Sequence, residues 1–223
     1  MIMILNLVGC GTSLEGTPIR NMNGLNSHIG ESTVALVGFR EDLSIYVYCT
    51  GVWVGDNKIV TAGHCVKDEE NPELDVVGTK LYYVVQKEVS ELKEDPTALH
   101  LAKVNLVDND HDLALLEAYV SGAPSHRVAK LAEELPGVGE GVYMVGHPRG
   151  LYYSYVSGTI SAYKKDSSIG PAIQINGTIW FGNSGGGIFD NNGNLLGICS
   201  RMAGVPGMSL FVHLDSIKEL LKG

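Results

Sequence analysis

The chain has 223 residues, a formal net charge of −9 and a sequence pI of about 5.2. A nucleic-acid-binding protein needs a basic face, so this acidic balance predicts no nucleic-acid partner. No apolar run is long enough to span a bilayer, and a 44% hydrophobic content with 28 glycines is typical of a globular, turn-rich protein.

The first ten residues form a short apolar segment that ends at Cys10. Leu7-Val8-Gly9 before Cys10 resembles the end of a bacterial lipoprotein signal, and lipid on Cys10 would be the one membrane contact that we expect. The pattern is incomplete because no basic region precedes the apolar run. A misplaced start codon and a plain apolar first segment are the two alternatives. We expect an apolar segment and linker over residues 1–29, with an irregular arm over residues 11–30.

From residue 32 onward, short β-type runs separated by turn signals predict an all-β fold. Apolar residues at helical spacing over 215–221 predict a short C-terminal helix. About a dozen strands and one helix favour two packed, six-stranded antiparallel β-barrels. We expect the two lobes over about residues 30–125 and 126–223, with a ligand site in the cleft between them. The predicted strands are 32–39, 43–48, 49–54, 58–61, 79–86, 101–107, 113–117, 141–145, 152–163, 172–175, 186–189, 195–199 and 208–212, with charged surface loops over 66–78 and 87–97.

Three of the four cysteines lie in this β-rich part of the chain. Cys49 and Cys65 bracket a strand pair whose ends can meet, and a disulfide there would add about 3 kcal/mol of stability in the chain-entropy model. Two buried thiols are the alternative. Cys199 lies in an apolar strand and is expected to be a free core cysteine.

The most informative motif is Phe181-Gly182-Asn183-Ser184-Gly185-Gly186-Gly187, which places one serine among four glycines. A glycine two residues before a serine permits a tight turn. Such a turn can point the N–H groups of Gly182 and Ser184 into one small space, as an oxyanion hole requires. An ordinary glycine-rich turn is the alternative reading.

Two upstream residues supply the groups that a serine nucleophile needs. His64 ends a β-type run between small residues and a cysteine, which suits a general base. Asp112 precedes the apolar run Leu113-Ala114-Leu115-Leu116, so its carboxylate can be buried where it orients the imidazole. His111, which directly precedes Asp112, is expected to point the opposite way and to lie at the surface.

The motifs Thr61-Ala62-Gly63-His64-Cys65, Asp112-Leu113-Ala114-Leu115 and Gly182-Asn183-Ser184-Gly185-Gly186 together resemble those of trypsin-like (chymotrypsin-fold) serine proteases. Val145-Gly146-His147-Pro148-Arg149-Gly150-Leu151 and Val156-Ser157-Gly158-Thr159-Ile160-Ser161 resemble more closely the protease domain of the bacterial HtrA/Deg group. The resemblance covers about residues 30–223, and Cys49 and Cys65 match the family's histidine-loop disulfide. We expect no PDZ domain, so the resemblance is not expected to extend to peptide sensing and cage assembly. Asn183 stands where trypsin has the aspartate that pairs with a freed N-terminus, so we do not expect activation by N-terminal cleavage.

The resemblance implies a serine endopeptidase that uses no metal or cofactor and acts on a protein or peptide. Ser184 would attack, His64 would transfer the proton, Asp112 would orient His64, and Gly182 with Ser184 would form the oxyanion hole. A binding protein on a silent protease scaffold and an esterase are the alternatives.

The same resemblance implies a substrate subsite. Thr178 would lie near the pocket base, Ser200 near the triad, and Arg201 and Met202 on the wall. No acidic residue occurs there, so an apolar residue is expected at the cleaved position. The disulfide and the lipoprotein-like start favour an extracytoplasmic bacterial location, while the oligomeric state is not predicted.

Overall fold

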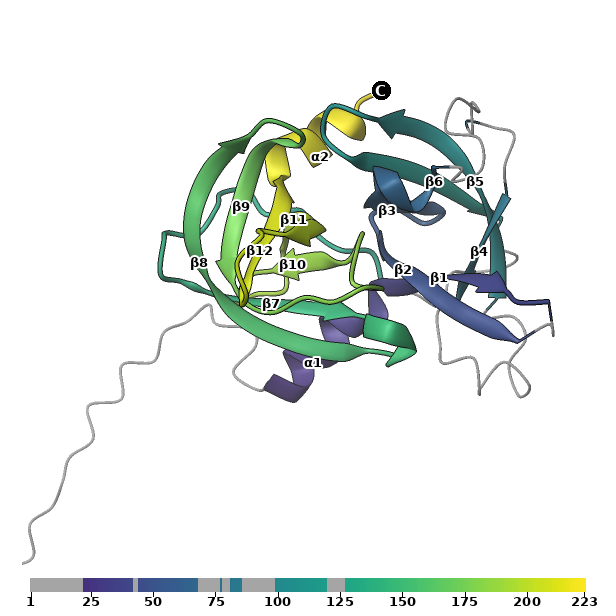
Figure 1. Ribbon diagram of the computed structural model, residues 1–223, viewed down its shortest axis with the longest axis horizontal. Helices are drawn as coiled ribbons and strands as arrows, with labels where there is room; N and C mark the ends of the chain where they lie inside the picture. Colours follow the sequence, from purple (N-terminus) through teal and green to yellow (C-terminus); the bar gives the residue numbers. More distant parts are fainter. Residues whose placement is uncertain (1–21, 42–43, 68–76, 78–80, 86–98, 120–126) are drawn as a thin grey trace, which may run out of the picture.

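The computed structural model describes residues 22–41, 44–67, 77, 81–85, 99–119 and 127–223. Within these residues, twelve strands form two closed antiparallel barrels that lie side by side (Figure 1). This arrangement confirms the predicted all-β, two-barrel fold. Cys10 and most of the two predicted charged loops lie outside the described residues, as do the ends of the predicted strand 79–86.

The first barrel has the strand order β1-β2-β3-β6-β5-β4, and β1 pairs with β4 to close it. The sequence predicted two strands over 43–48 and 49–54, but one continuous strand, β2, runs through both. The strands of the first barrel are β1 (Thr33–Phe39), β2 (Ile45–Trp53), β3 (Lys58–Ala62), β4 (Leu81–Val85), β5 (Leu99–Asp108) and β6 (Leu113–Tyr119).

The second barrel has the order β10-β11-β12-β9-β8-β7 and is closed by pairing of β10 with β7. It is followed by the predicted C-terminal helix, α2 (Leu214–Leu220), whose first turn is capped by the side chain of His213. The strands are β7 (Gly141–Gly146), β8 (Ser154–Asp166), β9 (Gly170–Asn176), β10 (Gly187–Phe189), β11 (Leu195–Met202) and β12 (Met208–His213).

An apolar core between the barrels explains why the first four residues of β6 are apolar on both faces. Leu113 and Leu115 pack into a cluster shared by both barrels, while Ala114 and Leu116 pack into the interior of the first barrel. Alternate residues of a strand point to opposite faces, so a strand buried on both faces reads as a continuous apolar run. This core fixes the two barrels against each other, and the candidate site lies at their junction.

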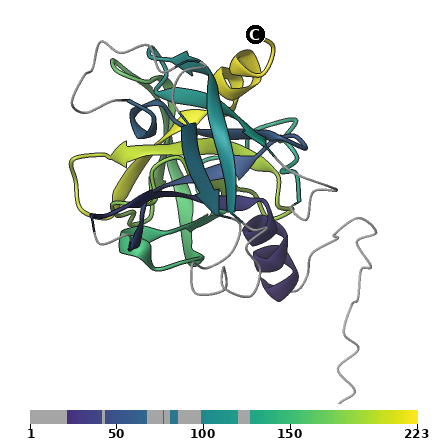
Figure 2. The ribbon, with the colours of Figure 1, turned by 90° about the vertical axis from the view of Figure 1, so that its right-hand side faces the viewer.

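A helix that the sequence analysis did not predict, α1 (Met22–Glu31), occupies part of the expected irregular arm. That expectation is wrong for these residues. Leu25 and Ile29 lie four residues apart on one face of the helix, and both are buried in the core shared by the barrels. The two helices lie at opposite ends of the molecule (Figures 1 and 2). Neither helix in the described ranges has the length and apolar character needed to cross a bilayer.

Replacing Ile29 by alanine should lower the free energy of unfolding by about 2–5 kcal/mol, because it removes a fully buried side chain and leaves a cavity. Chemical denaturation of purified protein measures this loss. Ser27→Ala on the exposed face of the same helix is the matched control and should change stability by less than about 0.5 kcal/mol. Equal effects of the two changes would mean that α1 does not anchor to the core.

Candidate active site

The pairing of β3 with β6 brings His64 beside Asp112. Ala62 pairs with Leu113, and the Gly63 N–H donates to the Asp112 carbonyl at 2.8 Å. The chain then turns through the short 3-10 helix Gly63–Cys65, so His64 faces the carboxylate. His64 Nδ1 lies 2.9 Å from Asp112 Oδ2 and 3.1 Å from Oδ1.

The Asp112 carboxylate accepts hydrogen bonds from three groups. Besides the His64 ring, the His64 backbone N–H donates to Oδ1 at 2.8 Å, and Ser200 Oγ donates to Oδ2 at 2.6 Å. Burial of the carboxyl favours its neutral form, but the hydrogen bonds from His64 and Ser200 outweigh burial and hold the pKa of Asp112 below its ordinary value. The Asp112 side chain is 17% exposed, whereas His64 is 42% exposed. The acid is therefore ionised and shielded, while the imidazole is open to a ligand.

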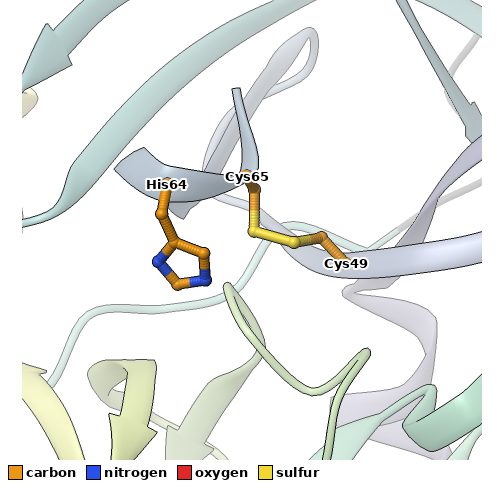
Figure 3. A group of neighbouring side chains, drawn as sticks. All are labelled: Cys49, His64 and Cys65. Carbon is orange, nitrogen blue, oxygen red and sulfur yellow. A yellow bond between two sulfur atoms is a disulfide. The ribbon is translucent and has the colours of Figure 1, made fainter. Parts of the chain in front are cut away.

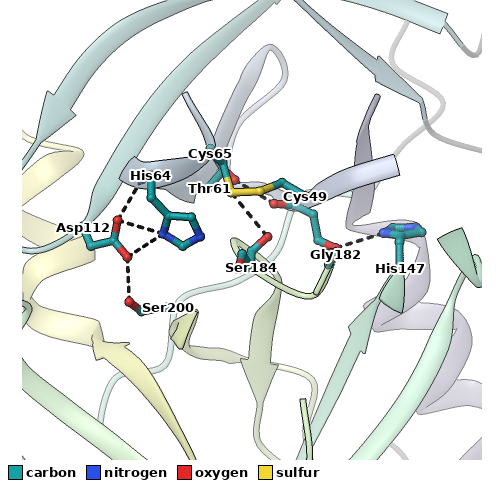
Figure 4. The surroundings of a disulfide bond; sticks show 10 residues. Cys49, Thr61, His64, Cys65, Asp112, His147, Gly182, Ser184 and Ser200 are labelled. Carbon is teal, nitrogen blue, oxygen red and sulfur yellow. Dashed lines mark hydrogen bonds and ion pairs between the residues drawn. A yellow bond between two sulfur atoms is a disulfide. The ribbon is translucent and has the colours of Figure 1, made fainter. Parts of the chain in front are cut away.

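Ser184 lies on the opposite side of the His64 ring from Asp112 (Figure 4). Its carbonyl accepts from the Thr50 N–H of the first barrel at 2.8 Å. The next residue, Gly185, donates to the Cys199 carbonyl of β11, also at 2.8 Å. The serine is thus tied to both barrels through backbone groups. In the described residues no hydrogen bond joins Ser184 Oγ to the His64 ring.

Two glycines permit the turn around Ser184. Gly182 has φ of +97°, and a side chain on it would meet the His147 carbonyl at 2.4 Å. Gly185 has φ of +82°, and a Cβ atom there would lie 2.1 Å from the Thr50 carbonyl. Both positions therefore require glycine. Among the described residues, no protein acceptor takes the N–H of Gly182 or Ser184, so both donors are available.

The predicted disulfide is confirmed, since Cys49 and Cys65 are bonded beside His64 (Figure 3). It links β2 to the segment that carries His64. Potential ligand atoms of Cys49, His64 and Cys65 lie within 4.8 Å of one another. Sulfurs that are bonded to each other are not thiolates, so this grouping does not favour a metal centre. Cys199 is a free, fully buried cysteine, as predicted.

The structure brings some of the predicted subsite residues to the site. Ser200 contacts Asp112 directly, as described above. Arg201 follows on β11, but its guanidinium pairs with Asp166 and Ser168 at the β8–β9 turn. Met202 is 48% exposed. Thr178 is exposed in the connection between β9 and β10. The subsite roles of these four residues remain predictions.

Sequence reasoning missed several residues at this junction. Thr50 and His147 are fully buried beside the Gly182 turn. Trp180 and Phe181 are exposed next to it, and the Arg149 guanidinium lies 5.2 Å from the centre of the Trp180 indole. Because Trp180 and Phe181 directly precede the glycines in the sequence, their position beside the site could have been predicted. The sequence gives no indication that Thr50 contacts this turn.

The expectation for His111 is met in part. Its side chain is still 25% exposed, but its Nδ1 lies 2.7 Å from Asp108 Oδ2. Its ring also packs against Gly170 of the second barrel, where a Cβ atom would lie 2.8 Å from the imidazole. His111 therefore contributes to the contact between the barrels.

Comparison with known proteins shows a family match. Residues 49–198 match the model of the trypsin-like peptidase domain. The "Probable periplasmic serine endoprotease DegP-like" of Ectopseudomonas mendocina is 35% identical over 131 residues, which are 54% of this chain and 27% of that protein. The mitochondrial serine protease HTRA2 of Drosophila persimilis is 31% identical over 154 residues, 66% of this chain and 34% of that protein. The match therefore spans about a third of these relatives' length.

Solved structures have the same fold. The serine endoprotease from Yersinia pestis superposes with a TM-score of 0.70 at 20% identity, covering 92% of this chain and 66% of that one. A protease from M. tuberculosis in its active form superposes with a TM-score of 0.68 at 18% identity, covering 90% of this chain and 84% of that one. At such identities these structures bear on the two-barrel fold alone.

Ser200→Ala should lower the free energy of unfolding at pH 7 by about 1.5–3 kcal/mol, because it removes a hydrogen bond to an ionised carboxylate. The pKa of Asp112 is lowered in the folded state, so the carboxylate contributes stability above about pH 4 that is lost as pH falls through the folded-state pKa. The variant raises that pKa, so its deficit should be full at pH 7 and should shrink below pH 4. Denaturation at both pH values measures this difference.

Ser209→Ala is the control, because Ser209 Oγ donates to the neutral Gly177 carbonyl at 2.7 Å. Its deficit should not depend on pH over this range. A Ser200→Ala deficit that is equally independent of pH would contradict the ionised state of Asp112.

Proposed function

Since the chain belongs to the trypsin-like peptidase family, as its sequence motifs predicted, we propose that it is a serine endopeptidase with Ser184, His64 and Asp112 as its catalytic triad. One observation carries the proposal: an open imidazole lies between a shielded carboxylate held by three donor groups and a serine on a glycine turn. Residues 30–223 would form the protease domain, with one lobe over about residues 30–125 and the other over about 126–223.

The charge of Asp112 determines which nitrogen of His64 acts as the base. An ionised carboxylate only accepts hydrogen bonds, so His64 Nδ1 must carry the proton that it donates to Asp112. Nε2 is then unprotonated and can accept the Ser184 hydroxyl proton. The carboxylate also stabilises the imidazolium that forms when Ser184 attacks. The missing hydrogen bond between Ser184 and His64 does not argue against this step, since such bonds often tighten only with substrate bound.

The reaction would proceed in two halves. Ser184 Oγ bonds to the substrate carbonyl carbon, and the resulting oxyanion accepts from the N–H groups of Gly182 and Ser184. The imidazolium of His64 then protonates the leaving amine as the peptide C–N bond breaks, which leaves an acyl-enzyme. His64 then takes a proton from water as the water oxygen bonds to the acyl carbon. The imidazolium returns this proton to Ser184 Oγ as the ester C–O bond breaks, which releases the new carboxylic acid and regenerates the serine.

The surroundings of Ser184 support an apolar preference at the cleaved position. Met202, Trp180 and Phe181 are large apolar residues that are 44–70% exposed, next to Ser200 or to the Gly182 turn. The charge of Arg201 is balanced by Asp166. Within the described residues, the two carboxylates that contact this segment are already paired, Asp112 with His64 and Ser200 and Asp166 with Arg201, so a basic substrate side chain would lack a free counter-ion there.

The compartment is a second part of the proposal. The disulfide suits an oxidising environment. The name of the Ectopseudomonas relative places that protein in the periplasm, whereas the Drosophila relative is named as mitochondrial. We propose an extracytoplasmic location for this chain and a protein or peptide as its substrate.

A fluorophosphonate probe should label Ser184 of the wild-type protein, and mass spectrometry of the adduct identifies the labelled residue. Labelling should be absent in Ser184→Ala and should slow by about 10⁴-fold or more in His64→Ala, because the serine hydroxyl is a weak nucleophile without its base. Absence of labelling in folded wild-type protein would favour a silent binding protein and would overturn the proposal.

A peptide-library digest should show cleavage after apolar rather than basic residues, with Ser184→Ala as the blank. Cleavage after Arg or Lys would refute the proposed preference. Turnover of small esters without cleavage of any peptide would instead identify an esterase.

Alkylation of free thiols, followed by mass spectrometry, should leave Cys49 and Cys65 unmodified in protein taken from its native compartment. Cys199 should react only after unfolding, because it is fully buried and burial strongly raises its pKa. Alkylated Cys49 and Cys65 would contradict an oxidising location.

A further inference from the structure

A buried chain of hydrogen bonds runs from His147 through Thr50 to the turn that carries Gly182. Thr50 Oγ1 donates to the Gly182 carbonyl at 2.6 Å and lies 3.1 Å from His147 Nδ1. Both side chains are fully buried. Figure 4 shows Gly182 and His147 on the side of Ser184 away from Asp112. Neither Thr50 nor His147 has a part in the proton transfers proposed above.

The direction of these hydrogen bonds follows from counting hydrogens. A threonine hydroxyl has one hydrogen, and the Gly182 carbonyl can only accept, so the Thr50 hydrogen is committed to Gly182. Thr50 Oγ1 must therefore act as the acceptor toward His147, and His147 Nδ1 must carry the proton. Within the described residues, His147 Nε2 has no hydrogen-bond partner. His147 is thus a neutral Nδ1–H tautomer that donates to Thr50, and each bond in such a chain polarises the next.

The other carbonyls of the turn are held as well, but by backbone groups. The Arg149 N–H donates to the Phe181 carbonyl at 2.8 Å, and the Gly186 N–H donates to the Asn183 carbonyl at 2.9 Å. In a trans peptide the N–H points opposite to the C=O, so these two bonds set the directions of the Gly182 and Ser184 N–H groups. The Thr50 hydroxyl holds the Gly182–Asn183 peptide between them, and the Thr50 N–H holds the Ser184 carbonyl.

We propose that Thr50 and His147 are positioning residues that fix the oxyanion turn, with His147 orienting the Thr50 hydroxyl and Thr50 holding the Gly182 carbonyl. This inference rests on the proposed function, because it assigns a purpose to the donors of that site. The rings of Tyr152 and Tyr153 pack edge-on against the imidazole at 5.5 and 5.0 Å between ring centres. Burial lowers the pKa of His147 to about 3, so the imidazole stays neutral across the working pH range of a protease.

The first test replaces the Thr50 hydroxyl by a methyl group. Thr50→Val should lower kcat by about 10–100-fold with little change in KM, because a misplaced oxyanion donor weakens transition-state binding and leaves ground-state binding intact. The affinity for a peptide aldehyde, whose adduct bears the oxyanion, should fall by a similar factor. Thr50→Ser keeps the hydroxyl and should restore most of both quantities.

Thr33→Val is the matched control, because Thr33 is a buried threonine whose Oγ1 donates to the Ile29 carbonyl at 2.8 Å, away from the turn. It should lower thermal stability by an amount similar to Thr50→Val, while kcat and aldehyde affinity stay at wild-type values. Unchanged kcat in a folded Thr50→Val variant would overturn the inference. So would equal losses of kcat in the two variants.

The second test uses the position of the donor on His147. The amide nitrogen of asparagine can occupy the place of Nδ1, whereas that of glutamine corresponds to Nε2, which has no partner here. His147→Asn should therefore retain much more kcat than His147→Gln. A Gln variant as active as the Asn variant would refute the role of Nδ1–H. If Thr50→Val does not fold, the comparison of His147→Asn with His147→Gln still tests the positioning role.

Fluorophosphonate labelling distinguishes a failure of the proposed function from a failure of the positioning inference alone. If wild-type Ser184 is not labelled, the proposed function fails and the positioning role falls with it. If wild-type Ser184 is labelled and turns over peptide, while the Thr50 and His147 variants match it in kcat, the positioning inference alone fails.

Discussion

The site depends on the close approach of β2 to the glycine turn of the second barrel. At this point the Thr50 N–H bonds to the Ser184 carbonyl, and the Gly185 backbone lies against the Thr50 carbonyl with no room for a side chain. A hydrogen bond contributes a net stabilisation of only about 1 kcal/mol, which could not hold two barrels together by itself. The contact persists because the apolar core between the barrels brings the same surfaces together over a wider area.

That core also explains the electrostatics of the site. Leu113 and Leu115 bury the strand that follows Asp112, so the carboxylate lies close to a low-dielectric interior. A buried carboxylate is stable in its ionised form only when donors surround it. His64 and Ser200 come from different barrels and supply these donors. Packing thus presents the acid to the imidazole, and the hydrogen bonds keep it charged.

The sequence predicted the features that depend on local pattern. The all-β pattern and the C-terminal helix follow from turn residues and helical spacing, and the structure confirms both, with the predicted strands 43–48 and 49–54 joined into one. The disulfide between Cys49 and Cys65, which the sequence left open beside two free thiols, is also present. Helix α1 was missed because its segment is rich in asparagine and glycine, and its stability comes from burying Leu25 and Ile29 against distant strands. Likewise, the burial of His147 arises from tertiary packing that no local pattern reports.

The division of the site between two barrels has a consequence for biosynthesis. Translation produces the first barrel, with His64 and Asp112, before the segment that carries Ser184 and its glycine turn. An emerging chain therefore holds the proposed base and carboxylate before the proposed nucleophile. The candidate site is complete only when the second barrel closes and docks, because Thr50 and the disulfide-linked His64 segment meet Ser184 at that step. The order of the chain thus delays assembly of the candidate site until the second barrel has folded.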